Sequence, residues 1–219
     1  MGLLALPGVY APKEDTALLE RALRGERVPG AHVLDVGTGT GALALAAARS
    51  GAERVVAVDI AWAAVLTARL NAALCRRRVH VLRGDLLAPV AGQLFDLVVA
   101  NPPYVPSSGE ELPAHGRRRA WEGGREGREL LDRLCAGVVP VLRPGGVLLV
   151  VHSELCGTAV TLDRLRRAGL TAEVADRRRV PFGPVLRSRG GWLRAHGLAR
   201  PGQETEELVV IRGRRIIDP

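Results

Sequence analysis

The chain has 219 residues, of which 47% are hydrophobic and 25% charged, and its formal net charge at pH 7 is +8. This length and balance predict one soluble domain, large enough to bury a sheet between helical layers. The apolar runs fall short of the roughly 20 residues that cross a bilayer, and the first residues lack the basic segment of a signal peptide, so we expect a cytoplasmic protein with no membrane contact.

Strand-like and helix-like segments alternate along the chain, and this pattern predicts a mostly parallel sheet with helices on both faces. Acidic residues begin the first helix and Gly25 ends it. We expect helices at 14–25, 41–50, 61–74, 126–142 and 158–168, and strands at 31–36, 54–59, 79–82, 94–100, 146–151, 170–176 and 206–212. The fold class is therefore α/β, a seven-stranded sheet of the Rossmann-like type in a single domain over residues 1–219.

Two segments are too long for simple connections. Residues 105–125 form a Gly-rich, charged loop, and loops of that length are often functional. Residues 177–203 form a basic insertion, which we expect to contain short helical pieces with Leu186, Trp192 and Leu193 packed inward and with its arginines exposed. These arginines are Arg177, Arg178, Arg179, Arg187, Arg189, Arg194 and Arg200. The hypothesis is that the insertion lies beside residues 101–104 and attracts an acidic or RNA-associated substrate.

The segment "VLDVGTGTG" places Gly37, Gly39 and Gly41 between the first strand and the second helix. Glycines at such a turn let the backbone bend sharply and approach a ligand closely. The spacing also satisfies the dinucleotide-binding fingerprint, and it is compatible with a tight turn that binds nothing. The glycines alone therefore leave the ligand open.

Three aspartates narrow the choice of ligand, because each follows or ends a strand on one rim of the sheet. Asp59 is placed to accept hydrogen bonds from both hydroxyls of a ribose, which suits NAD and S-adenosylmethionine (SAM) equally. Asp35 would repel a pyrophosphate but attract the cationic amino-acid part of SAM. Asp85 suits an adenine amino group, although a turn residue would also be typical here. Together they favour SAM.

The segment "NPPY" follows the apolar strand at 94–100. Pro102 and Pro103 fix the backbone and leave their carbonyls as acceptors, so the Asn101 side-chain oxygen and a proline carbonyl can accept both hydrogens of an NH2 group. Holding these hydrogens localises the nitrogen lone pair, which makes an amide or aromatic amine a better nucleophile. Tyr104 offers a flat face for a planar group. The alternative is a rigid strand end without a chemical role.

These motifs resemble the HemK-like family of SAM-dependent N-methyltransferases, most closely its short eukaryotic and archaeal-type branch. The resemblance covers most of residues 9–155, from "VYAPKEDTALL" to "RPGGVLLVV". It implies methylation of a protein glutamine, such as that of a release factor's Gly-Gly-Gln loop, by Asn101, Pro102 and Tyr104, and it leaves open a small activator subunit. It implies that SAM is bound by Tyr10, Thr16, Asp35, Gly37, Gly39, Gly41, Asp59, Asp85, Leu86 and Asn101.

Other interpretations remain open at this point. Nucleic-acid adenine or cytosine N-methylation would use a similar strand end and the basic insertion, although it is not favoured, because Lys13 is the only lysine and the arginine excess is typical of a GC-rich coding sequence. Methylation of a secondary metabolite and a non-catalytic SAM-binding role are further alternatives. Cys75, Cys135 and Cys156 are far apart and the histidines lack ligand spacing, so we predict no disulfide framework and no metal site.

Overall fold

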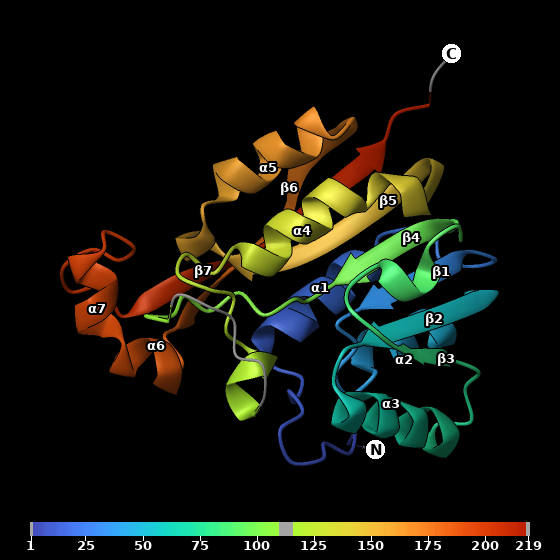
Figure 1. Ribbon diagram of the computed structural model, residues 1–219. Helices are drawn as coiled ribbons and strands as arrows, with labels where there is room; N and C mark the ends of the chain where they lie inside the picture. The colour runs from blue at the N-terminus through green and yellow to red at the C-terminus, as the bar shows by residue number, and fades with distance from the viewer. Residues whose placement is uncertain (1, 110–115, 218–219) are drawn as a thin grey trace.

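The computed structural model describes residues 2–109 and 116–217, and its seven strands form one sheet in the order β3-β2-β1-β4-β5-β7-β6 (Figure 1). Strands β1 to β5 are parallel to one another, whereas β7 is antiparallel to both β5 and β6. This confirms the predicted mostly parallel α/β sheet. The strands are β1 (His32–Val36), β2 (Arg54–Asp59), β3 (His80–Arg83), β4 (Phe95–Ala100), β5 (Leu142–Ser153), β6 (Leu170–Pro181) and β7 (Thr205–Arg215).

Helices cover both faces of the sheet, because neighbouring strand residues point to opposite sides. Val33 belongs to the core under α1, α2 and α3, and the adjacent Leu34 belongs to the core under α4 and α5. The helices are α1 (Glu14–Arg24), α2 (Ala42–Arg49), α3 (Trp62–Leu74), α4 (Glu129–Gly137), α5 (Thr158–Arg167), α6 (Pro184–Ser188) and α7 (Gly190–Ala195). Both cores are dominated by Val, Leu and Ala, and the central strands β1, β2, β4 and β5 are largely buried, whereas the edge strands β3 and β6 are partly exposed.

The helix predicted at 126–142 is shorter than expected. It ends at Gly137, and a 3-10 turn, η3 (Val139–Val141), leads into β5. Pro140 explains the difference, because a proline lacks the N–H group that would continue the helical bonding and restricts the residue before it.

The basic insertion predicted at 177–203 is also smaller, since β6 runs on to Pro181 and pairs with β7 over residues 177–181. The arginines near the C-terminal end of β6 lie on an edge strand of the sheet, where charged side chains can reach solvent. The true connection is residues 182–204, which hold α6 and α7 beside the start of β7 (Figure 1). We call residues 182–204 the α6–α7 segment.

The α6–α7 segment packs as the sequence predicts for its apolar residues but not for all its arginines. Leu186 and Leu193 are buried, and Trp192 is partly buried against them. Arg187 and Arg194 are exposed, whereas the Arg189 side chain is only 19% exposed and pairs with a carboxylate. The expectation that all the arginines face solvent is therefore wrong for Arg189.

Over residues 2–109 and 116–217, no helix is both long and apolar enough to cross a membrane, and no group of three or more His, Cys, Asp or Glu side chains is placed to hold a metal ion. Cys135 and Cys156 lie in the core as small buried residues, and Cys75 is partly exposed. One of the five histidines, His115, lies outside the described residues.

Candidate active site

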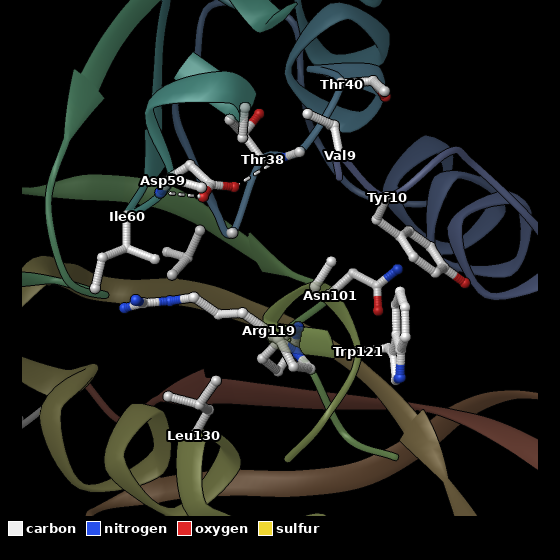
Figure 2. A pocket seen from close by; sticks show the side chains of 18 of the residues that line it. Val9, Tyr10, Thr38, Thr40, Asp59, Ile60, Asn101, Arg119, Trp121 and Leu130 are labelled. Atoms are coloured by element: carbon white, nitrogen blue, oxygen red, sulfur yellow. Dashed lines mark hydrogen bonds between the residues drawn. The ribbon is translucent and has the colours of Figure 1, made fainter. Parts of the chain in front are cut away.

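A cavity of about 840 Å³ opens at the carboxyl ends of the parallel strands, where sheets of this type bind ligands. Its wall comes from the N-terminal segment, α1, the loop after β1, the ends of β2 and β3, the segment after β4, and the 3-10 turn η2 (Arg117–Ala120) (Figure 2). Predicted site residues in this wall are Tyr10, Thr16, Gly37, Gly39, Asp59, Asp85, Leu86, Asn101, Pro102 and Tyr104. Asp35 and Gly41 do not line it.

The glycine loop owes its sequence to backbone geometry. Gly37, Gly39 and Gly41 all have positive φ, a conformation that other residues rarely adopt. The N–H groups of Gly37 and Thr38 both donate to the Val58 carbonyl oxygen, so the loop is fixed to β2. A Cβ on Gly41 would lie 3.3 Å from Ala68 of α3. Gly41 therefore serves helix packing, and the other two glycines shape the cavity.

Asp59 at the end of β2 connects the glycine loop to α3. Its Oδ2 accepts a hydrogen bond from the Gly39 N–H and its Oδ1 accepts one from the Ala61 N–H, both at 2.9 Å (Figure 2). Burial raises the pKa of Asp59, and these N–H bonds and the nearby Arg119 charge oppose that rise. Asp59 also lines the cavity, and its predicted role as an acceptor for ribose hydroxyls stays a prediction.

The structure places Asp35 below the glycine loop and not on the cavity rim, because it lies within β1 with no exposed surface. Its Oδ2 accepts hydrogen bonds from the Thr38 hydroxyl at 2.6 Å and from the Ala44 N–H at 3.1 Å. Burial raises the pKa of Asp35 to about 7. Its Oδ1 is buried and has no partner among the described residues. Asp35 thus fixes the glycine loop and the start of α2 through these two hydrogen bonds.

Asp85 lies at the mouth of the cavity and accepts a hydrogen bond from Arg133 of α4. Its side chain is 43% exposed, and Leu86 beside it has a φ of 46°, which is uncommon for a residue with a side chain. Sequence reasoning placed Asp85 at this edge but missed its partner, since Arg133 comes from a helix 48 residues further along the chain.

Asn101 stands at the end of β4, and its side chain lies between Tyr10 and Trp121 (Figure 2). The Asn101 Nδ2 donates to the Thr16 hydroxyl at 3.4 Å, a long bond that still orients the amide. With Nδ2 directed at α1, the Asn101 Oδ1 is left to accept hydrogen bonds from a ligand. Pro102 and Pro103 follow in the cavity wall, as predicted.

A buried carboxylate that the sequence did not single out joins both tyrosines of the chain. Asp15, in the first turn of α1, is 3% exposed. Its Oδ2 accepts hydrogen bonds from the hydroxyls of Tyr10 at 2.9 Å and Tyr104 at 3.0 Å, and its Oδ1 accepts one from the Thr16 N–H. Burial and the Asp15 charge raise the pKa of each tyrosine above its ordinary value. Tyr104 therefore anchors the motif, and its ring face as a surface for a planar group stays a prediction.

The opposite wall comes from the long loop noted in the sequence. Arg119 and Trp121 line the cavity, and in Figure 2 the Arg119 side chain reaches across it below Ile60. The Val105 N–H donates to the Trp121 carbonyl oxygen at 2.8 Å, so this wall is fixed to the chain just after Tyr104. Sequence reasoning weighed Trp121 as a cover or a packing anchor, and the structure places it in the cavity wall. The sequence feature that pointed to Trp121 was the unusual length of the loop that contains it.

Glu206 of β7 should make the stability of the protein depend on pH. It is 7% exposed, and burial raises its pKa to about 7, with the Ser153 hydrogen bond opposing and the charges of Asp15 and Glu154 adding. In the unfolded chain it titrates near its ordinary value, so between about pH 5 and 7 only the folded state holds the proton. Stability is therefore lost as pH rises through this window, by on the order of 1 to 3 kcal/mol.

We expect Glu206→Gln to flatten this part of the profile, measured as the free energy of urea unfolding between pH 5 and 8. Glu207→Gln is the matched control, because that neighbour is paired with Arg177. Asp35 contributes a loss of the same sign, since its pKa is also about 7, so some slope remains in both variants. A profile of Glu206→Gln that superimposes on the parent's would contradict the assignment.

The chain is similar to known methyltransferases over most of its length. Residues 1–116 match the family described as "Methyltransferase small domain". The chain is 38% identical over 180 residues to a Methanocaldococcus jannaschii protein named "Putative protein N5-glutamine methyltransferase", covering 82% of this chain and 90% of that one. It is 39% identical over 163 residues to the release factor glutamine methyltransferase of Moorella thermoacetica, covering 70% of this chain but only 58% of that protein's length.

Among solved structures, the chain superimposes on Mtq2 of E. cuniculi with a TM-score of 0.67 at 26% identity, covering 95% of this chain and 99% of that chain. That structure is a complex with Trm112 and is described as responsible for methylation of the eRF1 translation termination factor. Near-complete coverage of the archaeal and E. cuniculi proteins confirms the resemblance to the short branch. The predicted enzyme class, a SAM-dependent methyltransferase, is confirmed as well. The chain belongs to the methyltransferase small domain family.

Proposed function

We propose that this protein transfers the methyl group of SAM to the side-chain amide nitrogen of a glutamine in a protein substrate. The observation that carries the proposal is the position of Asn101, whose amide is oriented by Thr16 in the same cavity wall as the glycine loop and Asp59. The names of the archaeal and bacterial relatives and the description of the Mtq2 complex support glutamine in a protein as the acceptor. The seven strands share one sheet, which supports a single catalytic domain over residues 1–219.

The residues present fit SAM. The cavity has the volume of a site for a ligand of this size, and the Asp59 carboxylate can accept hydrogen bonds from ribose hydroxyls. The Asp35 Oδ1 has no partner among the described residues and lies beneath the glycine loop, where the ionised form of the carboxyl favours a cation over a pyrophosphate. Asp85 keeps one carboxylate oxygen for an amino group. When bound, SAM supplies a methyl group on a positively charged sulfur, which is open to attack by a nucleophile.

The part that the chain itself plays is to prepare the acceptor nitrogen. The Asn101 Oδ1 and the Pro102 carbonyl oxygen can accept the two hydrogens of an amide NH2 and hold them so that the nitrogen lone pair faces the methyl group. No strong base is needed for this step, because the nitrogen becomes acidic only after it has gained its methyl group. Asp15 keeps Tyr10 and Tyr104 in place beside Asn101.

The acceptor class can be tested directly. We expect the purified protein, incubated with labelled SAM and cell lysate, to label a product that protease destroys and nuclease does not. Digestion of that product should yield methylated glutamine. Label that nuclease removes would instead establish nucleic-acid methylation, and label in a small molecule would establish a metabolite substrate.

We further propose that a small protein subunit binds at α3, as Trm112 accompanies Mtq2 in its complex. Four residues of α3 spaced four apart form an exposed apolar row beside the edge strand β3: Trp62, Leu66, Leu70 and Leu74. Such a row on a soluble protein marks an interaction surface. If a lysate protein stimulates methylation of a glutamine peptide, Leu66→Asp/Leu70→Asp should abolish the stimulation. Equal turnover of the parent protein with and without lysate would show that the protein needs no subunit from the lysate.

A further inference from the structure

A buried carboxylate links the α6–α7 segment to the wall of the cavity that faces Asn101. Glu122 has 1% of its side chain exposed, and its Oε1 accepts hydrogen bonds from Arg118 at 2.8 Å and from Arg189. Arg189 lies between α6 and α7, and its second terminal nitrogen donates to the Pro106 carbonyl oxygen at 2.7 Å. One arginine side chain therefore bonds to two separate segments, at Glu122 in the cavity wall and at Pro106 directly after the wall residue Val105.

These two segments carry Tyr104 and Trp121, which lie on the acceptor side of the cavity, the side beside Asn101 where the methyl acceptor would bind. Glu122 follows Trp121 directly, and Pro106 comes two residues after Tyr104. Val105 and Glu122 form a β-bridge, and the Gly123 N–H donates to the Val105 carbonyl oxygen at 3.0 Å. Arg189 thus bonds to both sides of this bridged pair of segments, which we call the ribbon and whose residues Val105, Trp121 and Glu122 line the cavity.

Apolar packing continues the same connection. Phe182, Leu186 and Leu193 form a small core separate from the two cores of the sheet, and Val105 packs against it. The α6–α7 segment therefore touches the ribbon through both an ion pair and hydrophobic contacts. Its position after the edge strand β6 makes it an addition to the sheet and not a part of it.

Arg118 and Arg189 both stabilise the Glu122 carboxylate, and Arg189 is the less exposed of the two. Burial alone would raise the pKa of Glu122, but the bonds from Arg118 and Arg189 outweigh it and lower the pKa. The Arg118 side chain is 60% exposed, so water screens its charge, whereas that of Arg189 is 19% exposed. Loss of Arg189 would leave Glu122 with only the exposed Arg118, and a buried charge with so weak a partner is far more costly than loss of a surface pair.

We propose that Glu122 and Arg189 are positioning residues through which the α6–α7 segment sets the place of Trp121 and Tyr104 on the acceptor side of the cavity. The cofactor side is held separately, by the bonds of Asp59 and Asp35 to the glycine loop. Loss of the pair should therefore damage use of the methyl acceptor much more than SAM binding. The expected effect on the methyl acceptor rests on the proposed function.

The experiment compares Arg189→Ala with Arg187→Ala and Arg194→Ala, whose side chains are exposed on the same segment. We expect Arg189→Ala to lower kcat/KM for a glutamine peptide at least about tenfold through KM, with the Kd of SAM within about twofold of the parent. The two controls should stay close to the parent. Equal losses in all three variants would show a general effect of surface charge and overturn the proposal.

A fluorescence measurement tests the same inference without any methyl acceptor. Trp62→Phe/Trp192→Phe leaves Trp121 as the single tryptophan of the chain, since the sequence contains three. In this background Arg189→Ala should shift the Trp121 emission to the red and increase its quenching by acrylamide, while Arg187→Ala should not. An unchanged Trp121 signal would refute the positioning role even if activity fell. A changed signal with no glutamine methylation by the parent would uphold it and reject the proposed function.

Arg189→Ala leaves the buried Glu122 with only the exposed Arg118 as a partner, so it could unfold the segment. Glu122→Met/Arg189→Met removes both charges together and keeps similar side-chain volumes, a replacement that buried ion pairs often tolerate. This double variant should lose no more kcat/KM than Arg189→Ala alone, since the two residues act as one unit. Independent, multiplying losses from Glu122→Met and Arg189→Met would show that they do not work as a pair.

Discussion

Replacement of Asn101 by alanine is expected to lower turnover at least about 100-fold while the Kd of SAM changes only a few-fold. The side chain lies in the cavity wall with Nδ2 directed at Thr16 and Oδ1 left for the acceptor, so its loss removes a hydrogen-bond acceptor that acts on the reacting nitrogen. Steady-state kinetics with a glutamine peptide and calorimetry with SAM measure the two quantities separately.

Thr16→Val provides the matched comparison. It removes the hydroxyl that orients the Asn101 amide but keeps the amide itself, and the bond it deletes is long at 3.4 Å. We therefore expect a smaller loss of turnover than in Asn101→Ala. Unchanged turnover in Asn101→Ala would reduce the Asn-Pro-Pro-Tyr segment to a rigid strand end.

Replacement of Asp59 by alanine should weaken binding of SAM and of its demethylated product by roughly 10- to 150-fold, which corresponds to about 1.5 to 3 kcal/mol for a charged hydrogen bond. Two losses contribute. The glycine loop and α3 lose the acceptor of the Gly39 and Ala61 N–H groups, and the cavity loses a carboxylate that faces the ligand. Calorimetry with both nucleosides measures the loss. Asp163→Ala, which removes an exposed carboxylate of α5 paired with Arg167, should leave both affinities unchanged.

The same titrations distinguish the two ligands that the glycine spacing allows. At pH 8, NADH should bind more weakly than SAM, because the Asp35 carboxyl below the glycine loop is then mostly ionised and would repel its pyrophosphate. Binding of NADH as tight as that of SAM would contradict the assignment of this loop.

The fold was predictable because its signals are local. Strands such as β2, predicted at 54–59 and observed at Arg54–Asp59, are short apolar runs between turn residues, and the alternation of strands and helices determines a mostly parallel sheet. The larger errors fell at Pro140 and at the end of β6. There the outcome depends on a single proline or on pairing with β7, which lies far along the chain.

The site was predictable to the extent that strand ends meet at one rim. Asn101, Asp59 and Asp85 reach the cavity wall for that reason. The partners that hold such residues come from distant parts of the chain, as Asp15 does for Tyr104, 89 residues away. Sequence pattern alone carries no record of such a contact.

The partners of buried charged side chains could not be predicted from the sequence either. Asp35 looked like a rim residue because it precedes the glycines, but its carboxylate turns inward to Thr38 and Ala44. Arg189 looked like one more surface arginine in a basic run, yet it is the one that meets the buried Glu122. In both cases the packing of separate elements decided the role, and composition could not reveal it.

The most direct test of the account is mass spectrometry of a glutamine-containing peptide incubated with the purified protein and SAM. The account predicts a single added methyl group on the glutamine side-chain nitrogen, absent when that glutamine is replaced by glutamate and absent with Asn101→Ala. A methyl group found on another residue, or a peptide left unmodified while nucleic acid in a parallel reaction is methylated, would contradict it.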